Sequence, residues 1–143
     1  MKRKATAVWR GDVKDGKGTL STDSTVLKEA PYSFSTRFES GTGTNPEELL
    51  AAAHAGCFAM AVSSQLGKAG LTPQKLEATA TITFEKVDGH FAITKSRLDL
   101  RAQVPGANRE KFNAAVKAAE TGCPVSKLFK AEISVEARLE VAV

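Results

Sequence analysis

The feature that most constrains this chain is a long, alanine-rich stretch from residue 43 to residue 70. Its start carries a capping asparagine, a proline that fits the first helical position, and two carboxylates that suit the positive end of a helix dipole. These residues are Asn45, Pro46, Glu47 and Glu48. Gly67 or Gly70 can end the helix. The stretch therefore predicts one helix of about six turns, at about 3.6 residues per turn.

The middle of this predicted helix has little side-chain bulk on any face. Its small residues surround Cys57 and are Ala51, Ala52, Ala53, Ala55, Gly56, Ala59 and Ala61. A helix that is apolar all round is normally buried, and small residues let a neighbouring backbone approach closely. We therefore expect Cys57 deep in the protein, where the helix meets another element or another chain. A lone buried cysteine is most simply a small hydrophobic residue, but Cys123 adds a second thiol.

Composition favours an ordinary globular protein. The 143 residues suit a single domain, 1–143, with a sizeable core. The net charge is +4, from 20 Lys+Arg against 16 Asp+Glu, and the basic residues are spread along the chain. Aromatic residues make up only 6%, with no basic run that interleaves with them. Nucleic-acid binding is therefore not expected.

The chain also lacks the signals of export or membrane insertion. The N-terminal residues are charged, and no apolar run of signal-peptide type follows them. Polar residues interrupt the alanine-rich stretch, so no membrane span is expected: His54, Ser63, Ser64 and Gln65. We expect a cytoplasmic protein. In that compartment two cysteines are more often free, catalytic or redox-active than joined in a structural disulfide.

Alternation of apolar and polar residues predicts strands on both sides of the long helix. Asp88-Gly89 is typical of a tight hairpin turn. A second helix is expected over 108–121, capped by Asn108, and a short helical turn over 123–128. The expected strands are 5–10, 18–22, 32–38, 75–86, 91–104 and 131–141. The order β-β-β-α-β-β-α-β predicts an α+β domain of antiparallel sheets around the buried central helix. So few short strands cannot cover that helix alone, so a second chain is expected.

Four residues carry the expected chemistry. Cys123 precedes Pro124 at a helix start, where free amides and the helix dipole favour a thiolate. Cys57, in mid-helix, receives no such help from its own helix. Arg37, expected on the 32–38 strand facing away from the aromatics, is the candidate that would lower the pKa of this thiol. Glu47 or Glu48 could hold the arginine in a bidentate pair.

The position of Glu47 raises a question of geometry. It precedes Cys57 by ten residues, which on a straight helix corresponds to about 15 Å along the axis. If both residues serve one site, either the helix start bends sharply or the partner subunit's Glu47 serves that site. The bare alanine surface favours the second alternative.

Two reactive thiols in one cytoplasmic chain suggest dithiol chemistry. Oxidation of a reactive thiolate gives a sulfenic acid, and a neighbouring thiol condenses with it to a disulfide. Metal binding by Cys57, Cys123, His54 and His90 is an alternative, although these residues lack the usual ligand spacing. His54 lies three residues before Cys57 and shares its helix face. We expect it to be a hydrogen-bonded core or interface histidine, not a base.

Five blocks of sequence resemble one family. They are Trp9-x-Gly11-Asp12 with Gly16-Lys17-Gly18-Thr19; Pro31-Tyr32-x-Phe34 followed by Thr36-Arg37-Phe38-Glu39; Gly43-Thr44-Asn45-Pro46-Glu47-Glu48-Leu49; Ala52-Ala53-His54-Ala55-x-Cys57-Phe58; and Gly122-Cys123-Pro124-Val125-Ser126. On these blocks the chain closely resembles the OsmC/Ohr family over nearly its whole length. The arginine just before the helix points to the osmotically inducible OsmC branch and away from Ohr.

The resemblance implies a thiol-dependent peroxidase that reduces organic hydroperoxides and, more weakly, hydrogen peroxide, in oxidative and osmotic stress defence. It assigns Cys57 as the peroxidatic cysteine and Cys123 as the resolving one. Arg37 matches the residue that activates the peroxidatic thiolate, and Glu47 the residue that orients Arg37. The family forms an intertwined homodimer with two sites at the subunit interface and uses no metal or flavin. Dihydrolipoyl groups on carrier proteins, or other dithiols, reduce its disulfide.

One rival interpretation belongs to another class of function. The protein could be a non-catalytic dimeric binding module that holds an apolar, fatty-acyl-like ligand, with both cysteines merely buried. The two hypotheses differ in whether a hydroperoxide consumes the thiols.

Overall fold

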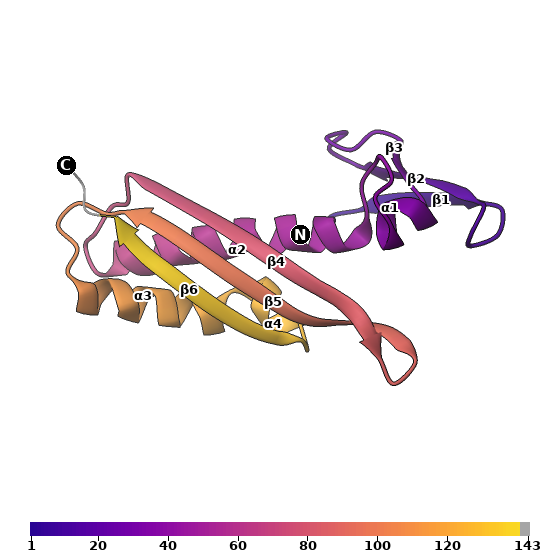
Figure 1. Cartoon of the computed structure of the whole chain (residues 1–143). Helices are drawn as coiled ribbons and strands as arrows, with labels where there is room; N and C mark the ends of the chain where they lie inside the picture. The colour runs from indigo at the N-terminus through magenta and orange to yellow at the C-terminus, as the bar shows by residue number, and fades with distance from the viewer. Residues whose placement is uncertain (141–143) are drawn as a thin grey trace. The chain divides into compact units, whose positions relative to one another are not determined.

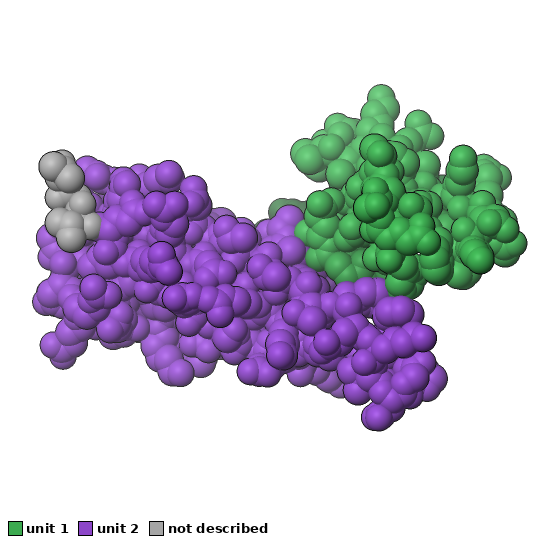
Figure 2. Space-filling view, viewed as in Figure 1, with its two compact units in different colours: residues 1–49 green, residues 50–143 purple. Residues whose placement is uncertain are grey.

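The computed structural model describes residues 1–140. The chain divides into two compact units, unit 1 over Met1–Leu49 and unit 2 over Leu50–Val143 (Figure 2). Each unit is described by itself. The expectation of a single domain over 1–143 stays a prediction.

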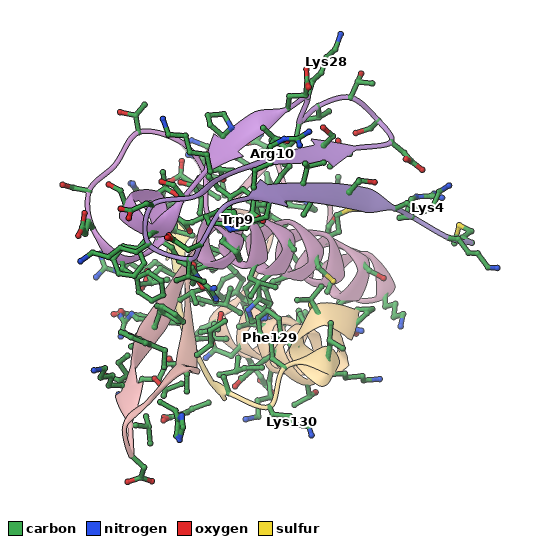
Figure 3. All side chains as sticks on the ribbon, turned by 90° about the vertical axis from the view of Figure 1, so that its right-hand side faces the viewer. Lys4, Trp9, Arg10, Lys28, Phe129 and Lys130 are labelled. Carbon is green, nitrogen blue, oxygen red and sulfur yellow. The ribbon has the colours of Figure 1, made fainter. Side chains whose placement is uncertain are left out.

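Unit 1 is built on a three-stranded antiparallel sheet in the order β1-β2-β3. The strands are β1 (Ala5–Arg10), β2 (Lys17–Thr22) and β3 (Ala30–Tyr32). The ring of Trp9, labelled in Figure 3, lies against that of Tyr32, with centroids 5.4 Å apart. Trp9 of β1 therefore packs across the sheet against Tyr32 of β3.

The predicted strand over 32–38 is wrong. Only its first residue belongs to β3, and Phe34–Phe38 form a short helix, α1. Ser33 caps this helix reciprocally with Thr36, and Phe34 and Phe38 pack one turn apart with ring centroids 4.7 Å from each other. Phe34 and Phe38 fit both the alternation of a strand and the four-residue spacing of a helix. The Ser33–Thr36 capping box favours the helix. Arg37 thus lies on a helix, and its guanidinium lies 5.6 Å from the Phe38 ring centroid.

The long helix, α2, runs from Pro46 to Lys68 as predicted. Asn45 Oδ1 accepts a hydrogen bond from the Glu48 backbone N–H at 2.7 Å, which confirms the predicted cap. The Asn45 amide also donates to the Thr36 carbonyl at 3.0 Å and so ties α1 to the start of α2.

Unit 2 contains a second three-stranded sheet in the order β4-β5-β6. Its strands are β4 (Lys75–Val87), β5 (His90–Gln103) and β6 (Glu132–Glu140). The predicted hairpin joins β4 and β5, with Asp88 and Gly89 both at positive φ, 51° and 81°, as a type I′ turn requires. The predicted end of the last strand, Val141, lies outside the described residues.

The expectation of purely antiparallel sheets is wrong for this unit, because β6 pairs with β5 in parallel. Two helices lie in the connection between them, α3 (Arg109–Gly122) and α4 (Pro124–Leu128). A crossover of this kind returns the chain in the same direction, which a hairpin cannot do. Because α3 and α4 lie between β5 and β6, this sheet is not a simple antiparallel meander.

The core of unit 2 lies between the sheet and its helices (Figure 1). Alternate residues of β5 point inward, so the strand has one buried face. The core side chains come from α2, β5 and α3 and include Phe58, Val62, Leu66, Leu98, Leu100, Ala102, Phe112 and Ala119. Ion pairs cover the opposite face of the sheet, where Arg97 contacts Glu136 and Arg101 contacts Glu140. One face is thus dry and the other charged.

The helix α2 is buried on one face only, so the expectation of burial all round is not met within this chain. Ala52, Ala53 and Gly56 are exposed, and Met60 retains 77% of its accessible surface. Among residues 1–140, α2 is also the one helix long and apolar enough to cross a membrane. That finding contradicts the expectation that no segment would qualify. Core helices of soluble proteins pass the same test, and α2 packs its other face on the sheet of unit 2.

Candidate active site

The two cysteines meet in unit 2. Cys57 lies in the middle of α2, and Cys123 is the N-cap residue of α4, immediately after the end of α3. Their Sγ atoms are 3.0 Å apart, and both thiols are free. Cys123 is fully buried, whereas Cys57 is half-buried and not deep in the protein as expected. Two sulfurs 66 residues apart in sequence are thus within hydrogen-bonding distance.

The two thiols differ in acidity because their surroundings differ. Burial raises the pKa of Cys57, and so does its hydrogen bond to Cys123, while the Val125 backbone N–H opposes this. Burial also acts to raise the pKa of Cys123, but hydrogen bonds from Cys57, from Ser126 and from the Val125 amide outweigh it and lower that pKa. Within unit 2, the shared negative charge therefore favours Cys123.

The start of α4 favours a Cys123 thiolate, as predicted from the sequence. The same helix start also acts on Cys57 through the Val125 backbone N–H, which was not predicted. Burial nevertheless leaves the pKa of Cys57 raised, so a cation is still needed if Cys57 is to react as a thiolate.

Arg37 and Glu47 meet in unit 1. Arg37 Nε donates to Glu47 Oε1 at 2.9 Å, which confirms that Glu47 pairs with the arginine. Glu48 does not compete, because it accepts from the Thr44 hydroxyl at 2.8 Å. Glu47 is buried, and within residues 1–140 its Oε2 accepts no hydrogen bond. The expected bidentate pair is thus not formed in this arrangement.

An apolar pocket of about 230 Å³ adjoins Arg37 in unit 1. Aromatic side chains from β1, β3 and α1 form most of its wall; the lining residues are Trp9, Val13, Tyr32, Ser33, Phe34, Arg37 and Phe38. A guanidinium at the edge of an aromatic pocket can hold the polar end of a molecule whose remainder is apolar.

A buried polar cluster that was not predicted from the sequence surrounds His54. Its Nδ1 lies 2.6 Å from Ser96 Oγ and its Nε2 2.8 Å from Ser126 Oγ. Burial lowers the pKa of His54. The expectation of a hydrogen-bonded core histidine is confirmed. The sequence feature that could have indicated this cluster is Ser96, a polar residue on the same buried face of β5 as Leu98 and Leu100.

The predicted site residues therefore form two pairs, Cys57 with Cys123 in unit 2 and Arg37 with Glu47 in unit 1. That the pairs share one site stays a prediction. Over the described residues 1–140, no three His, Cys, Asp or Glu side chains gather closely enough to hold a metal ion. Both His54 ring nitrogens are taken by serines, and His90 lies at the β4–β5 hairpin.

Comparison with known proteins decides the family. The model of the OsmC-like protein family matches residues 39–138, which include both cysteines and Glu47. The chain is 51% identical over 138 residues to the peroxiredoxin OsmC of Escherichia coli, with 96% of each chain covered. The chain belongs to the OsmC family. The resemblance inferred from the sequence blocks is therefore confirmed.

More distant relatives and solved structures share the fold. The organic hydroperoxide resistance protein OhrB of Bacillus subtilis is 29% identical over 124 residues, covering 86% of this chain and 89% of its own. Its crystal structure matches with a TM-score of 0.68 over 96% of this chain and 98% of that chain. An OsmC-like protein of unknown function from Vibrio cholerae shares the fold, with a TM-score of 0.76 at 15% identity over 96% of this chain and 99% of that chain. The α+β OsmC-like fold is therefore confirmed.

Proposed function

We propose that this OsmC-family chain is a thiol-dependent peroxidase that reduces organic hydroperoxides, and hydrogen peroxide more weakly, in oxidative and osmotic stress defence. The observation that carries the proposal is the 3.0 Å separation of the Cys57 and Cys123 sulfurs. Two free thiols in contact can become a disulfide with little movement, which is what a two-cysteine peroxidase requires. A peroxiredoxin 51% identical over nearly the whole chain supports the same chemistry.

Cys57 is the peroxidatic residue in this proposal. Its thiolate attacks the distal oxygen of ROOH, the O–O bond breaks, and the alkoxide takes a proton and leaves as ROH. Cys57 becomes a sulfenic acid. Half-burial gives a peroxide access to Cys57 that fully buried Cys123 lacks, and this difference supports the assignment.

Cys123 is the resolving residue. Its sulfur attacks the Cys57 sulfur of the sulfenic acid, the S–S bond forms and the S–O bond breaks, and hydroxide leaves with the Cys123 proton as water. The lowered pKa of Cys123 supports this role, because an attacking thiol must lose its proton. An external dithiol, which we propose to be a dihydrolipoyl group on a carrier protein, then reduces the disulfide.

Arg37 supplies the cation that Cys57 needs, and Glu47 orients it. The raised pKa of Cys57 supports this assignment, because the Val125 hydrogen bond does not outweigh the effect of burial. A guanidinium can both stabilise the thiolate and hold the peroxide oxygens. The aromatic pocket beside Arg37 would take the apolar R group, which favours alkyl or lipid peroxides over hydrogen peroxide.

The site is completed by a second subunit. The exposed face of α2 carries alanines, Gly56 and Met60, which supports close packing against another copy of the chain in an intertwined homodimer. Because α2 is continuous from Pro46 to Lys68, Glu47 and Cys57 are separated by about 15 Å of helix, and the partner subunit's Glu47 serves this Cys57. The dimer works in the cytoplasm, where dithiol reductants keep its thiols free.

Thiol titration tests the peroxidase. One equivalent of cumene hydroperoxide should remove two thiols from each chain, while Cys57→Ser should lose none and consume no peroxide. Cys123→Ser should complete one turnover and then accumulate overoxidised Cys57, detected by mass spectrometry. Unchanged thiols in the natural protein would favour the rival hypothesis of a dimeric binding module for an apolar, fatty-acyl-like ligand. Full steady-state turnover by Cys123→Ser with dithiol would refute the resolving role.

A further inference from the structure

His54 and the two serines that it contacts form a buried polar cluster that has no role in the proposed peroxidase mechanism. His54 lies on α2 one turn before Cys57, and its two ring nitrogens contact Ser96 of β5 and Ser126 of α4. All three side chains are buried, with exposed fractions of 0%, 0% and 6%. Phe129, labelled in Figure 3 just after α4, packs edge-on against the imidazole with ring centroids 4.9 Å apart. Such a fully satisfied polar cluster fixes its members in one geometry.

Ser126 joins this cluster to the thiols. It is the third residue of α4, and Cys123 is the N-cap of the same helix. In that relation the side chain at the third position lies against the cap residue, as in a capping box. The Ser126 hydroxyl and amide both interact with the Cys123 sulfur. Ser126 Oγ therefore lies 2.8 Å from His54 Nε2, and the same hydroxyl acts to lower the pKa of Cys123.

The hydrogen-bond directions follow from the number of protons. A Ser126 hydroxyl has one proton, so if it donates to Cys123 Sγ, its oxygen accepts from His54 Nε2–H. Neutral His54 then accepts at Nδ1 from the Ser96 hydroxyl. Every bond in the chain Ser96–His54–Ser126–Cys123 then points toward the sulfur, which is the arrangement that stabilises a thiolate.

We propose that Ser96, His54 and Ser126 form a positioning network that aims the Ser126 hydroxyl at Cys123 Sγ and so keeps this thiol ready to lose its proton. The network acts on the resolving step. When Cys123 attacks the Cys57 sulfenic acid, its S–H bond breaks, the S–S bond forms and the S–O bond breaks, and the proton leaves with hydroxide as water. His54 touches neither sulfur through its ring nitrogens in this arrangement, so it is a positioning residue.

Other groups around Cys123 also lower the pKa of its thiol, and they must be separated from the Ser126 hydroxyl. From α2, Cys57 shares a hydrogen bond with it, and His54 acts through Ser126. From α4 come the Val125 and Ser126 amides, and β5 contributes uncharged Ser96. On α3, Glu120 pairs with Lys117 at 3.9 Å. Among the contacts described within residues 1–140, the Cys57 thiol and the Ser126 hydroxyl are the two that a substitution can remove while the backbone stays unchanged.

The consequence for catalysis rests on the proposed function, but the effect on the thiol can be measured without any peroxide. In a Cys57→Ser background the chain keeps one cysteine, so thiolate absorbance at 240 nm against pH reports Cys123 alone. Ser126→Ala should raise the titration midpoint by about one pH unit, which is a tenfold loss of thiolate below the midpoint. His54→Gln should raise it similarly, and Ser126→Thr, which keeps the hydroxyl, should restore it.

Val62→Ala is the matched control, because it loosens the same core without touching the network. It should leave the midpoint where the Cys57→Ser parent has it. A Ser126→Ala midpoint equal to that of the parent, or a Val62→Ala shift as large as that of Ser126→Ala, would overturn the proposal. Ser126→Ala removes one oxygen atom only, so the test does not depend on whether His54→Gln folds.

A second measurement separates this proposal from the peroxidase itself. With both cysteines present, one equivalent of cumene hydroperoxide is added with dimedone, which traps sulfenic acid. Ser126→Ala should accumulate several-fold more Cys57 adduct than the natural protein, because the resolving thiol attacks more slowly. If the midpoint shifts but no chain forms sulfenic acid, the network stands and the peroxidase fails. If sulfenic acid forms but the midpoint does not move, the network fails and the peroxidase stands.

Discussion

At the scale of single residues, the chemistry depends on one unfavourable feature of Cys57. Its burial raises the pKa of the thiol, and a protonated thiol reacts poorly with peroxides. The nearby helix start favours the other sulfur, that of Cys123. Cys57 therefore needs a cation to react as a thiolate at neutral pH, and we propose Arg37, which pairs with Glu47, for that role.

Replacing Arg37 by glutamine tests the requirement directly. Loss of an adjacent positive charge should raise the pKa of Cys57 by about one to three units, so the peroxide reaction at pH 7 should slow by about ten- to a thousand-fold. The rising limb of the pH–rate profile should move to higher pH by the same amount, measured by stopped flow with cumene hydroperoxide. Arg10→Gln, at an exposed position of β1, is the matched control. Identical rising limbs for Arg37→Gln and Arg10→Gln would contradict the assignment.

His54 also makes the stability of the fold depend on pH. Burial lowers its pKa, so the unfolded chain binds a proton more readily than the folded chain below about pH 6.5. The stabilisation is full above that pH and is lost as pH falls toward the lowered value. Urea unfolding should therefore show a lower free energy of unfolding at pH 5.5 than at pH 7.5.

The two histidines of the chain offer a control for this effect. His54→Gln should reduce the difference in unfolding free energy between the two pH values, whereas His90→Gln, at an exposed hairpin position, should preserve it. The natural protein and His54→Gln losing equal stability on acidification would show that other groups cause the loss.

At the scale of elements, α3 positions Cys123, which is the residue that ends this helix. Asn108 Oδ1 caps the start of α3 by accepting from the Lys111 backbone N–H at 2.8 Å. Asn108→Ala should lower the free energy of unfolding by about 1 kcal/mol. Asn113→Ala, at an exposed position within the same helix, should be neutral or slightly stabilising, because alanine has the higher helix propensity. Equal unfolding midpoints for the two variants would contradict the role of the cap.

The elements that could be predicted from the sequence are those with helix-capping or turn residues at their ends. Asn45 and Asn108 marked helix starts, and Asp88-Gly89 marked the hairpin, because each satisfies backbone groups of its own neighbourhood. Alternation misled at 32–38, where Phe34 and Phe38 fit two periods and only the Ser33–Thr36 capping box distinguished them. The parallel pairing of β6 with β5 could not be predicted, since strand direction depends on a crossover and not on any residue of the strand.

The candidate site shows the same division. The pairing of Arg37 with Glu47 followed from charge and proximity in sequence, and the meeting of Cys57 with Cys123 was predicted through the family resemblance. The partners of His54 were missed, because Ser96 and Ser126 lie 42 and 72 residues from it in sequence. Serines carry no charge and have many structural uses, so only the three-dimensional structure distinguishes these two from the others.

At the scale of the whole molecule, the exposed face of α2 supports the proposed homodimer. Unit 1 contains Arg37, Glu47 and the aromatic pocket, while unit 2 contains the two thiols. In a two-fold dimer, each complete site would combine unit 2 of one chain with unit 1 of the other. An inactivating substitution in unit 1 of one chain and another in unit 2 of its partner should then leave one complete site in the dimer.

Complementation between two inactive variants tests this arrangement. Cys57→Ser and Arg37→Gln chains are co-expressed with different affinity tags, and the doubly tagged heterodimer is isolated. One of its two sites would join an intact Cys57 to an intact Arg37 from the other chain, so about half of natural activity should return. A heterodimer of two Cys57→Ser chains with the same tags is the control and should stay inactive. If the mixed heterodimer shows only the mean activity of its two parent variants, each chain uses its own Arg37, and the shared site is refuted.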